Sequence, residues 1–226
     1  MDKNNVILCG AGTSVKEGLD LDLWNQIKGK GDIWSINFAF MTVPYLPTRE
    51  IWVDYNFFKN NIDALQDLSH KGVEMIAKAN PKYAGIPMIN SYNTTRERAK
   101  YAGKEGIEKN LMFVGTQGLS GVFALSIAVA MGYKNIFLLG FDYGIPFNAS
   151  DKTFTHYYQK ELNVNSSGFK HPENYLTNDL QTVKKDVADF EVYLKETDVK
   201  IWNVSLGSHI PYFDKISYLT FFEILK

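Results

Sequence analysis

The chain has 226 residues, of which 45% are hydrophobic and 22% charged, and its 24 basic and 25 acidic side chains leave a net charge of −1. This length can bury one sizeable core but falls short of two full domains, so we predict a single domain over 1–226. The balanced charge excludes the basic footprint of proteins that bind nucleic acid or an anionic membrane.

The sequence also predicts where the chain works. The single cysteine, Cys9, cannot form an internal disulfide, and residues 1–5 lack the basic and then apolar layout of a signal peptide. Both observations predict a reducing, cytoplasmic location. The uncharged stretch 111–133 has the length of a membrane span, but four glycines and several polar side chains divide it. We therefore predict a strand, a turn and a buried helix there rather than a span. A homo-oligomer stays open.

The first expected element is a short apolar strand, Val6–Cys9, which leads into the turn Gly10-Ala11-Gly12-Thr13-Ser14. A strand followed by a glycine turn is how mononucleotide-binding sheets begin. No third glycine completes a dinucleotide fingerprint, and no Lys-Thr pair completes a P-loop. A plain tight turn and a cradle for a phosphate or a sugar therefore both fit.

Helices and strands are then expected to alternate as far as residue 90. Apolar spacing predicts helices over 20–28 and 60–69, and strands over 33–37, 51–55, 73–77 and 87–90. Asn37 ends the first of these strands, where Rossmann-like folds read a ribose or a base edge; an Asx turn is the alternative. The aromatic loop 38–47 could wall a pocket. The basic stretch 91–105 is expected to be a solvent-facing helix, with a phosphate-facing arginine as the alternative.

The strongest pattern lies between residues 115 and 142. A turn punctuated by glycines leads into an apolar helix over 122–131, and Gly132 is suited to end that helix in a left-handed conformation. The apolar run 136–140 predicts a strand buried on both faces, and Asp142 follows its carboxyl end. This order is half of a doubly wound unit, so we predict an α/β, Rossmann-like, mostly parallel sheet.

The start of this helix is a candidate anion site. Ser120 is expected to cap the helix, and the free N–H groups of its first turn would suit a phosphate. Ligands of doubly wound sheets bind in the crevice beyond the carboxyl ends of the strands, which is where this turn is expected to lie.

A polar segment rich in Tyr, Asn, Ser and His follows over 143–175. It is too long for an ordinary connection in a compact domain, and long loops of this kind are often active-site lids, so we predict a lid-like insertion. A helix is then expected over 177–197 and a last strand over 199–204. The polar turn 205–209 follows that strand.

The residue types narrow the chemistry. The four histidines have no metal-binding spacing, and no GxSxG nucleophile elbow is present. Amides at two helix starts would suit the phosphates of a nucleotide, a histidine could accept a proton from an attacking hydroxyl, and tyrosines could stabilise a departing phosphate oxygen. The sequence thus predicts nucleotide-dependent group transfer to a hydroxyl acceptor. The polar groups expected at one sheet edge are the turn 10–14, Asn37, Asp54, the turn 117–121, Asp142 and the turn 205–208.

Several segments carry a resemblance to known proteins. In order along the chain, residues 6–14, 35–37, 120–122 and 131–142 resemble the small bacterial sialyltransferases that act on lipooligosaccharide. They are equally similar to the group that joins flagellar motility accessory factors to 6-hydroxymethylpterin diphosphokinases, and 202–210 resembles the ending of that group. The match covers most of the chain in order, and its specific part is 120–142.

The resemblance implies a Rossmann-like sheet with a lid. In the sialyltransferase branch it implies a CMP-sugar donor and no metal, with a lid histidine as the base and tyrosines at the leaving phosphate. The candidate catalytic residues are His156 as the base, His171 as its alternative, Tyr157 and Tyr158. The candidate nucleotide-binding residues are Gly10, Gly12, Thr13, Ser14, Asn37, Gln117, Ser120, Gly121, Asp142 and Tyr143.

The chain also departs from this family. Ala11 stands where an asparagine is usual, and Gln117 stands where an arginine is usual. The leading prediction is a glycosyltransferase that uses a CMP-type sugar. One alternative is a pyrophosphokinase that acts on a pterin-like substrate with Mg-ATP, with Mg²⁺ at Asp54 or Asp142. The other is a catalytically degenerate nucleotide-binding or interaction module.

Overall fold

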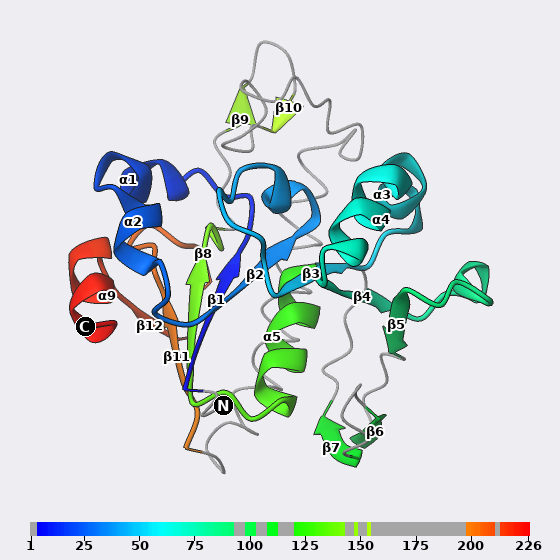
Figure 1. Ribbon diagram of the computed structural model, residues 1–226. Coiled ribbons are helices and arrows are strands. Elements are labelled where there is room, and N and C mark those ends of the chain that lie inside the picture. Colours follow the sequence, from blue (N-terminus) through cyan, green and yellow to red (C-terminus); the bar gives the residue numbers. More distant parts are fainter. Residues whose placement is uncertain are drawn as a thin grey trace.

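The centre of the molecule is an eight-stranded sheet in the order β12-β11-β8-β1-β2-β3-β4-β5 (Figure 1). The computed structural model describes residues 4–92, 98–102, 108–112, 120–142, 147–148, 153–154, 198–210 and 213–226. Every pair of neighbours in this sheet is parallel, which confirms the predicted Rossmann-like α/β fold. Its strands are β1 (Asn5–Cys9), β2 (Asp32–Ile36), β3 (Arg49–Trp52), β4 (Glu74–Lys78), β5 (Ile89–Tyr92), β8 (Asn135–Leu139), β11 (Lys200–Asn203) and β12 (Asp214–Lys215).

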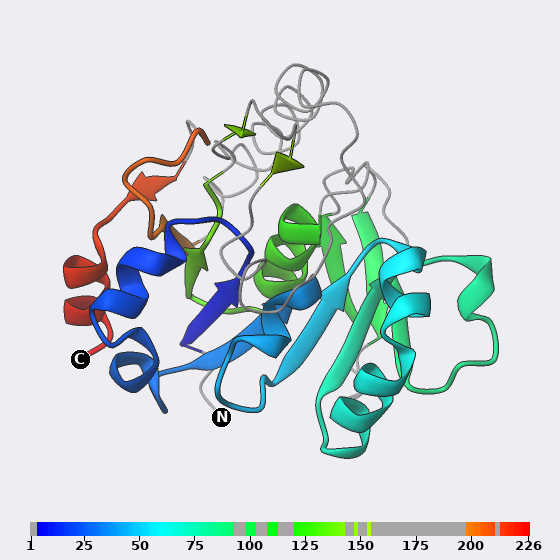
Figure 2. The same ribbon diagram turned by 90° about the horizontal axis from the view of Figure 1, so that it is seen from above.

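Helices cover both faces of this sheet (Figure 2). Helix α5 (Ser120–Ala130) lies on one face, and its side chains are buried on nearly every side, as its all-round apolar sequence requires. The helices on the other face are α1 (Val15–Asp20), α2 (Leu23–Ile27), α3 (Tyr55–Asn60), α4 (Ile62–His70) and α9 (Tyr218–Ile224). Two short 3₁₀ helices, η1 (Asn37–Met41) and η2 (Pro81–Tyr83), complete the described helices.

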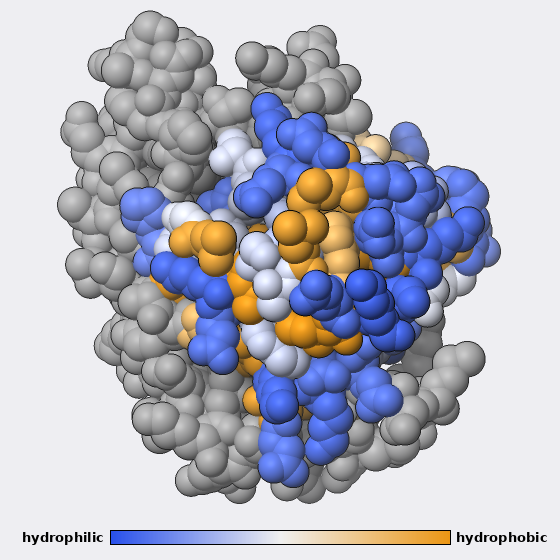
Figure 3. All heavy atoms as spheres, turned by 90° about the vertical axis from the view of Figure 1, so that its left-hand side faces the viewer, coloured by the Kyte–Doolittle hydropathy of each residue, from blue (hydrophilic) through white to orange (hydrophobic). Residues whose placement is uncertain are grey.

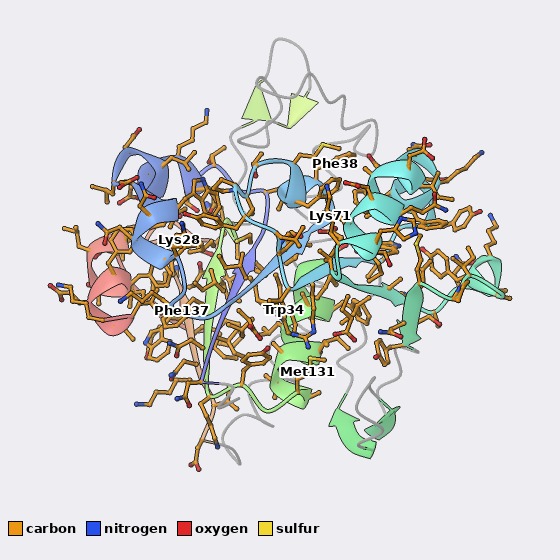
Figure 4. The ribbon with its side chains drawn as sticks, in the orientation of Figure 1. Lys28, Trp34, Phe38, Lys71, Met131 and Phe137 are labelled. Atoms are coloured by element: carbon orange, nitrogen blue, oxygen red, sulfur yellow. The ribbon has the colours of Figure 1, made fainter. Side chains whose placement is uncertain are left out.

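Successive side chains of the strands point alternately to the two faces of the sheet and pack against the helices there. Trp34 packs on the α5 side and Phe137 on the α9 side, and both are labelled in Figure 4. The Phe137 ring stacks on Trp202 with centroids 4.9 Å apart and meets Phe221 of α9 at 4.9 Å. Each such side chain stabilises the fold by about 1.5–3 kcal/mol when it leaves water, so both faces of the sheet contribute to stability.

Some elements differ from the sequence-based expectation. The helix expected over 20–28 is shorter and covers only α2, because Asp22 adopts a left-handed φ of 59° and separates α2 from α1, which was not expected. The basic stretch expected as a helix contains strand β6 (Arg98–Ala102), which pairs antiparallel with β7 (Glu108–Met112). Charged and uncharged residues alternate over 98–101, and this period of two is typical of a strand. Elements α3, β12 and α9 were not expected.

The uncharged stretch 111–133 is divided as predicted, since β7 ends at Met112 and α5 has 11 residues. In the described parts of the chain, no helix combines the length and the apolarity that a bilayer crossing needs. Strands β9 (Phe147–Asn148) and β10 (Thr153–Phe154) form an antiparallel pair beyond the carboxyl ends of the sheet strands (Figure 1). The rest of the lid predicted over 143–175, and the helix predicted over 177–197, lie outside the described residues.

Helices α1 and α9 pack against each other at Gly18. A Cβ atom there would lie 2.3 Å from the ring of Tyr218, so only glycine allows this approach. The outer sides of the two helices carry exposed apolar side chains, Leu19, Leu219 and Ile224, and Figure 3 shows an apolar area framed by hydrophilic residues on this side of the molecule. The predicted homo-oligomer stays a prediction.

Candidate functional site

The candidate site lies where the strand order reverses. From β1 the chain continues to β2 on one side, whereas from β8 the chain goes on to the opposite side, where β11 lies. Ligands of open α/β sheets bind at such a switch point, outside the carboxyl ends of the strands. Here the switch point lies between Gly10–Ser14, which follows β1, and Gly140–Asp142, which follows β8.

The first glycine turn is bound closely to the end of β8. The Gly10 amide donates to the Leu139 carbonyl at 2.8 Å, and the Gly12 amide donates to the Gly140 carbonyl at 2.9 Å. A Cβ atom on Gly12 would lie 2.6 Å from both the Gly140 carbonyl oxygen and Asp142 Oδ2. Gly140 itself has a φ of +69°. The glycines therefore allow two backbone segments to meet, and the two amides that they offer face β8 rather than a ligand.

Asp142 fixes the remainder of this turn. Its side chain is buried, with 7% of its surface exposed. The Ser14 amide donates to Asp142 Oδ2 at 2.7 Å, the Ser14 hydroxyl donates to Oδ1, and the Thr13 hydroxyl donates to Oδ2 at 3.4 Å. The protein thus supplies its own anion before the first turn of α1. The Ser14 amide expected to hold a phosphate is engaged, so any contribution of Asp142 to ligand binding acts through the shape of the turn.

A second polar contact joins β2 to the start of α5. The Ser120 hydroxyl donates to Asn37 Oδ1 at 3.2 Å, and Ser120 is 8% exposed. Asn37 has a φ of +54°, which asparagine tolerates better than most residues. Helix α5 begins at Ser120, whose hydroxyl donates to the Asn37 side chain, and the predicted capping role of Ser120 stays a prediction. Among the described residues, the Asn37 side-chain amide nitrogen has no partner.

These contacts place the first glycine turn and the start of α5 on one rim. Because β1 and β2 are parallel neighbours, Thr13 and Asn37 both lie at the carboxyl edge of the sheet. Ser120 binds Asn37 directly, and the half-buried Gly121 follows Ser120 in α5. The structure therefore brings together the predicted residues of both segments. The predicted site residues outside the described ranges are Gln117, Tyr143, His156, Tyr157, Tyr158 and His171.

The turn after β11 is bound to the same edge by a buried network. The Ser208 hydroxyl donates to the Phe141 carbonyl at 2.7 Å, and Asn203 Nδ2 donates to Ser208 Oγ at 2.8 Å. The His209 amide donates to the Asp142 carbonyl at 2.7 Å. Lys215 Nζ donates to the Ser208 carbonyl at 2.6 Å. This third segment therefore borders the switch point on the β11 side.

The acidic residues proposed for Mg²⁺ do not meet. Asp54 accepts the Asn56 amide at 2.8 Å and caps α3. It follows β3, so β1 and β2 separate it from Asp142 after β8, a distance of three strand spacings or about 14 Å. In the described part of the chain, no group of three or more His, Cys, Asp or Glu side chains is placed to hold a metal ion. Asp54 and Asp142 cannot share one ion.

The aromatic loop 38–47 packs inward. The Phe38 ring meets Phe57 of α3 edge-on with centroids 5.1 Å apart, and Phe40 meets Phe57 at 6.5 Å. Phe38 is half-buried near the upper edge of the sheet in Figure 4. The loop therefore joins α3 to the sheet, and the pocket wall expected from its sequence stays a prediction.

A cluster of charged side chains lies at the opposite edge of the sheet. Arg49 Nε contacts Glu74 Oε2 at 2.8 Å, and Arg49 Nη1 lies 3.7 Å from Asp32 Oδ2. The Tyr133 hydroxyl donates to the Asp32 carboxylate, and burial raises the pKa of Tyr133 above its ordinary value. The Arg49 guanidinium also lies over the Trp34 ring at 4.9 Å. These residues begin their strands, so their charges stabilise the amino edge and do not face the candidate site.

Comparison with known proteins agrees with this fold. No protein-family model matches the chain, and no curated protein sequence matches it. Its structure is similar to that of the MAf glycosyltransferase from Magnetospirillum magneticum AMB-1, with a TM-score of 0.57 and 15% identity over 96% of this chain and 34% of that one. The monofunctional alpha-2,3-sialyltransferase Cst-I from Campylobacter jejuni gives a TM-score of 0.49 at 14% identity, over 91% of this chain and 77% of that one. The chain thus spans about a third of the length of the MAf glycosyltransferase and shares its Rossmann-like fold.

Proposed function

We propose that the chain binds a nucleotide-activated sugar at the carboxyl edge of the sheet and transfers the sugar to a hydroxyl acceptor, with a CMP-type donor preferred. One observation carries the proposal: the bond between Ser120 and Asn37 places the start of α5 beside the first glycine turn. The MAf glycosyltransferase, which has the same fold, supports glycosyl transfer as the reaction class.

The start of α5 suits the donor phosphate. The helix has 11 residues and no acidic side chain in its first turn, so its N–H groups and dipole favour an anion. By contrast, the Asp142 carboxylate already occupies the position before α1 and would repel a second anion there. The phosphate is therefore proposed to lie on the α5 side of the crevice.

Asn37 suits the base of the donor. Its Oδ1 accepts the Ser120 hydroxyl, which orients the side chain and leaves Nδ2 as a donor. A cytosine base offers O2 and N3 as acceptors, so Nδ2 can bind either of them. The left-handed backbone at Asn37 is a conformation that proteins retain where the surrounding structure fixes it, often at ligand sites.

The sequence offers further candidates for the roles that this reaction needs. His156 or His171 is the sequence-based candidate for the base, Tyr157 and Tyr158 are the candidates for stabilising the leaving phosphate, and Gln117 and Tyr143 are further candidates for donor binding. This reaction does not require a metal ion, because the leaving nucleoside monophosphate carries a single phosphate.

Calorimetry with CMP, UDP and ATP tests the proposal. We expect saturable binding of CMP, and we expect Asn37→Asp to weaken it at least tenfold. Aspartate can still accept the Ser120 hydroxyl, but it has no N–H to donate to the base. Asn56→Asp, which makes the same change at an exposed position of α3, is the matched control and should bind CMP like the wild type.

The outcomes separate the three predicted functions. No saturable binding of any of the three nucleotides would remove the proposal. Binding of ATP that falls steeply when a chelator is added would favour the pyrophosphokinase. CMP binding without sugar transfer to any acceptor would favour the degenerate binding module.

A further inference from the structure

The turn after β11 places one histidine at the carboxyl edge of the sheet. The His209 amide donates to the Asp142 carbonyl at 2.7 Å, and the preceding residue, Ser208, is fixed by its own bond to Phe141. The backbone of this turn is therefore held in place, whereas the His209 side chain is exposed. A general base must reach the proton that it accepts, and an exposed imidazole on a fixed turn can contact a ligand at this edge.

His209 is the histidine that the described residues place at this edge. The other described histidine, His70, ends α4 just before β4 and therefore lies at the amino edge of the sheet. His209 instead follows β11, and β11 is the neighbour of β8 on the side away from β1 (Figure 1). The imidazole thus belongs to the rim that carries Asn37 and the start of α5.

The strand order gives the distance along the sheet edge between Asn37 and His209. Asn37 follows β2 and His209 follows β11, so three strand spacings, or about 14 Å, separate them. This is the order of length of a nucleoside monophosphate with one sugar attached. A donor with its base at Asn37 and its phosphate in front of α5 can extend its sugar along this edge toward β8 and β11, where His209 lies.

Resting on the proposed function, we propose that His209 is the general base of the transfer. Its neutral imidazole accepts the proton of the acceptor hydroxyl while the acceptor oxygen bonds to the anomeric carbon of the donor. The bond between that carbon and the phosphate oxygen breaks, and its electron pair leaves with the nucleotide. The imidazolium then returns the proton to water. The charged groups on neighbouring elements are Asp142, Lys215 and Asp214.

The first test observes the ring without requiring turnover. In the full chain, the Cε1–Hε1 NMR resonances of His209 and His70 are assigned by His209→Gln and His70→Gln, and CMP-sialic acid is then added to saturation. We expect the His209 resonance to shift and the His70 resonance to stay within error of its free position. CMP-sialic acid that binds by calorimetry but leaves the His209 resonance unchanged would overturn the inference and leave the proposed function standing.

The second test measures transfer as a function of pH. His209→Gln should bind CMP like the wild type, lower kcat by about 100- to 10,000-fold, and remove the rise of kcat/KM with pH that a histidine base produces. His70→Gln should change neither quantity. The competing variants are His156→Gln and His171→Gln. Loss of the pH-dependent rise in either of these, with its retention in His209→Gln, would overturn the inference. A wild type that binds no nucleotide would instead refute the proposed function, and the inference would fall with it.

Discussion

Replacing Gly12 by alanine tests the close approach of β1 and β8 at the switch point. The added Cβ would lie 2.6 Å from the Gly140 carbonyl oxygen and 2.6 Å from Asp142 Oδ2, about 1 Å inside ordinary contact. Neither atom can retreat freely, because the carbonyl accepts the Gly12 amide at 2.9 Å and the carboxylate holds Ser14. Overpacking of this kind costs about 1–3 kcal/mol. For a domain of this size, that cost lowers the melting temperature by about 2–12 °C.

The matched control is Gly207→Ala in the turn after β11. A Cβ atom at Gly207 has no neighbour within 4 Å, so we expect a change within about 0.5 kcal/mol. Both variants and the wild type are melted under the same conditions by circular dichroism, and urea unfolding then gives the free-energy difference. Equal melting temperatures for Gly12→Ala and Gly207→Ala would refute the close approach.

Three further predictions address buried polar groups. Asp142→Asn keeps one oxygen for the Ser14 amide but turns an NH2 group toward the Ser14 hydroxyl, which must then accept instead of donate, and it removes the charge from both bonds. We therefore expect a loss of about 1 kcal/mol in urea unfolding, and an unchanged midpoint would contradict the network. Burial holds the pKa of the Glu50 carboxyl well above its ordinary value, so the folded state binds this proton more tightly than the unfolded chain does. The stability that Glu50 contributes is present below about pH 4.3 and is lost as the pH rises toward the folded pKa. The free energy of unfolding of Glu50→Gln should therefore increase relative to that of the wild type between about pH 5 and pH 8. A difference that does not change with pH would contradict the prediction. Burial raises the pKa of the Cys9 thiol to about 12, so iodoacetamide should label Cys9 only after unfolding, and rapid labelling of the native protein, seen by intact mass, would show the thiol to be accessible.

The fold was predictable where apolar patterning is strong. The runs 6–9, 136–140 and 199–204 predict strands, and each contains most of a strand of the sheet. The pattern is weaker where tertiary contacts decide the structure. In helix α9 the positions of the apolar residues match the contacts with Phe137 and α1 and do not repeat with a clear helical period. Strand β12 has only two residues, which is too short to show any period.

The sheet edge at which the described candidate residues lie was predictable, but the contacts among them were not. Both glycine turns, Asn37 and Asp142 could be assigned to one edge, because the carboxyl ends of parallel strands share an edge. The sequence does not say which anion each turn meets: a phosphate and the Asp142 carboxylate satisfy the Ser14 amide equally well, and the choice depends on contacts 128 residues apart in the chain. That choice has a chemical consequence. With the position before α1 filled from within the protein, the proposed place of the donor phosphate is the start of α5 instead, and the proposed place of the reacting sugar is toward β11 and His209.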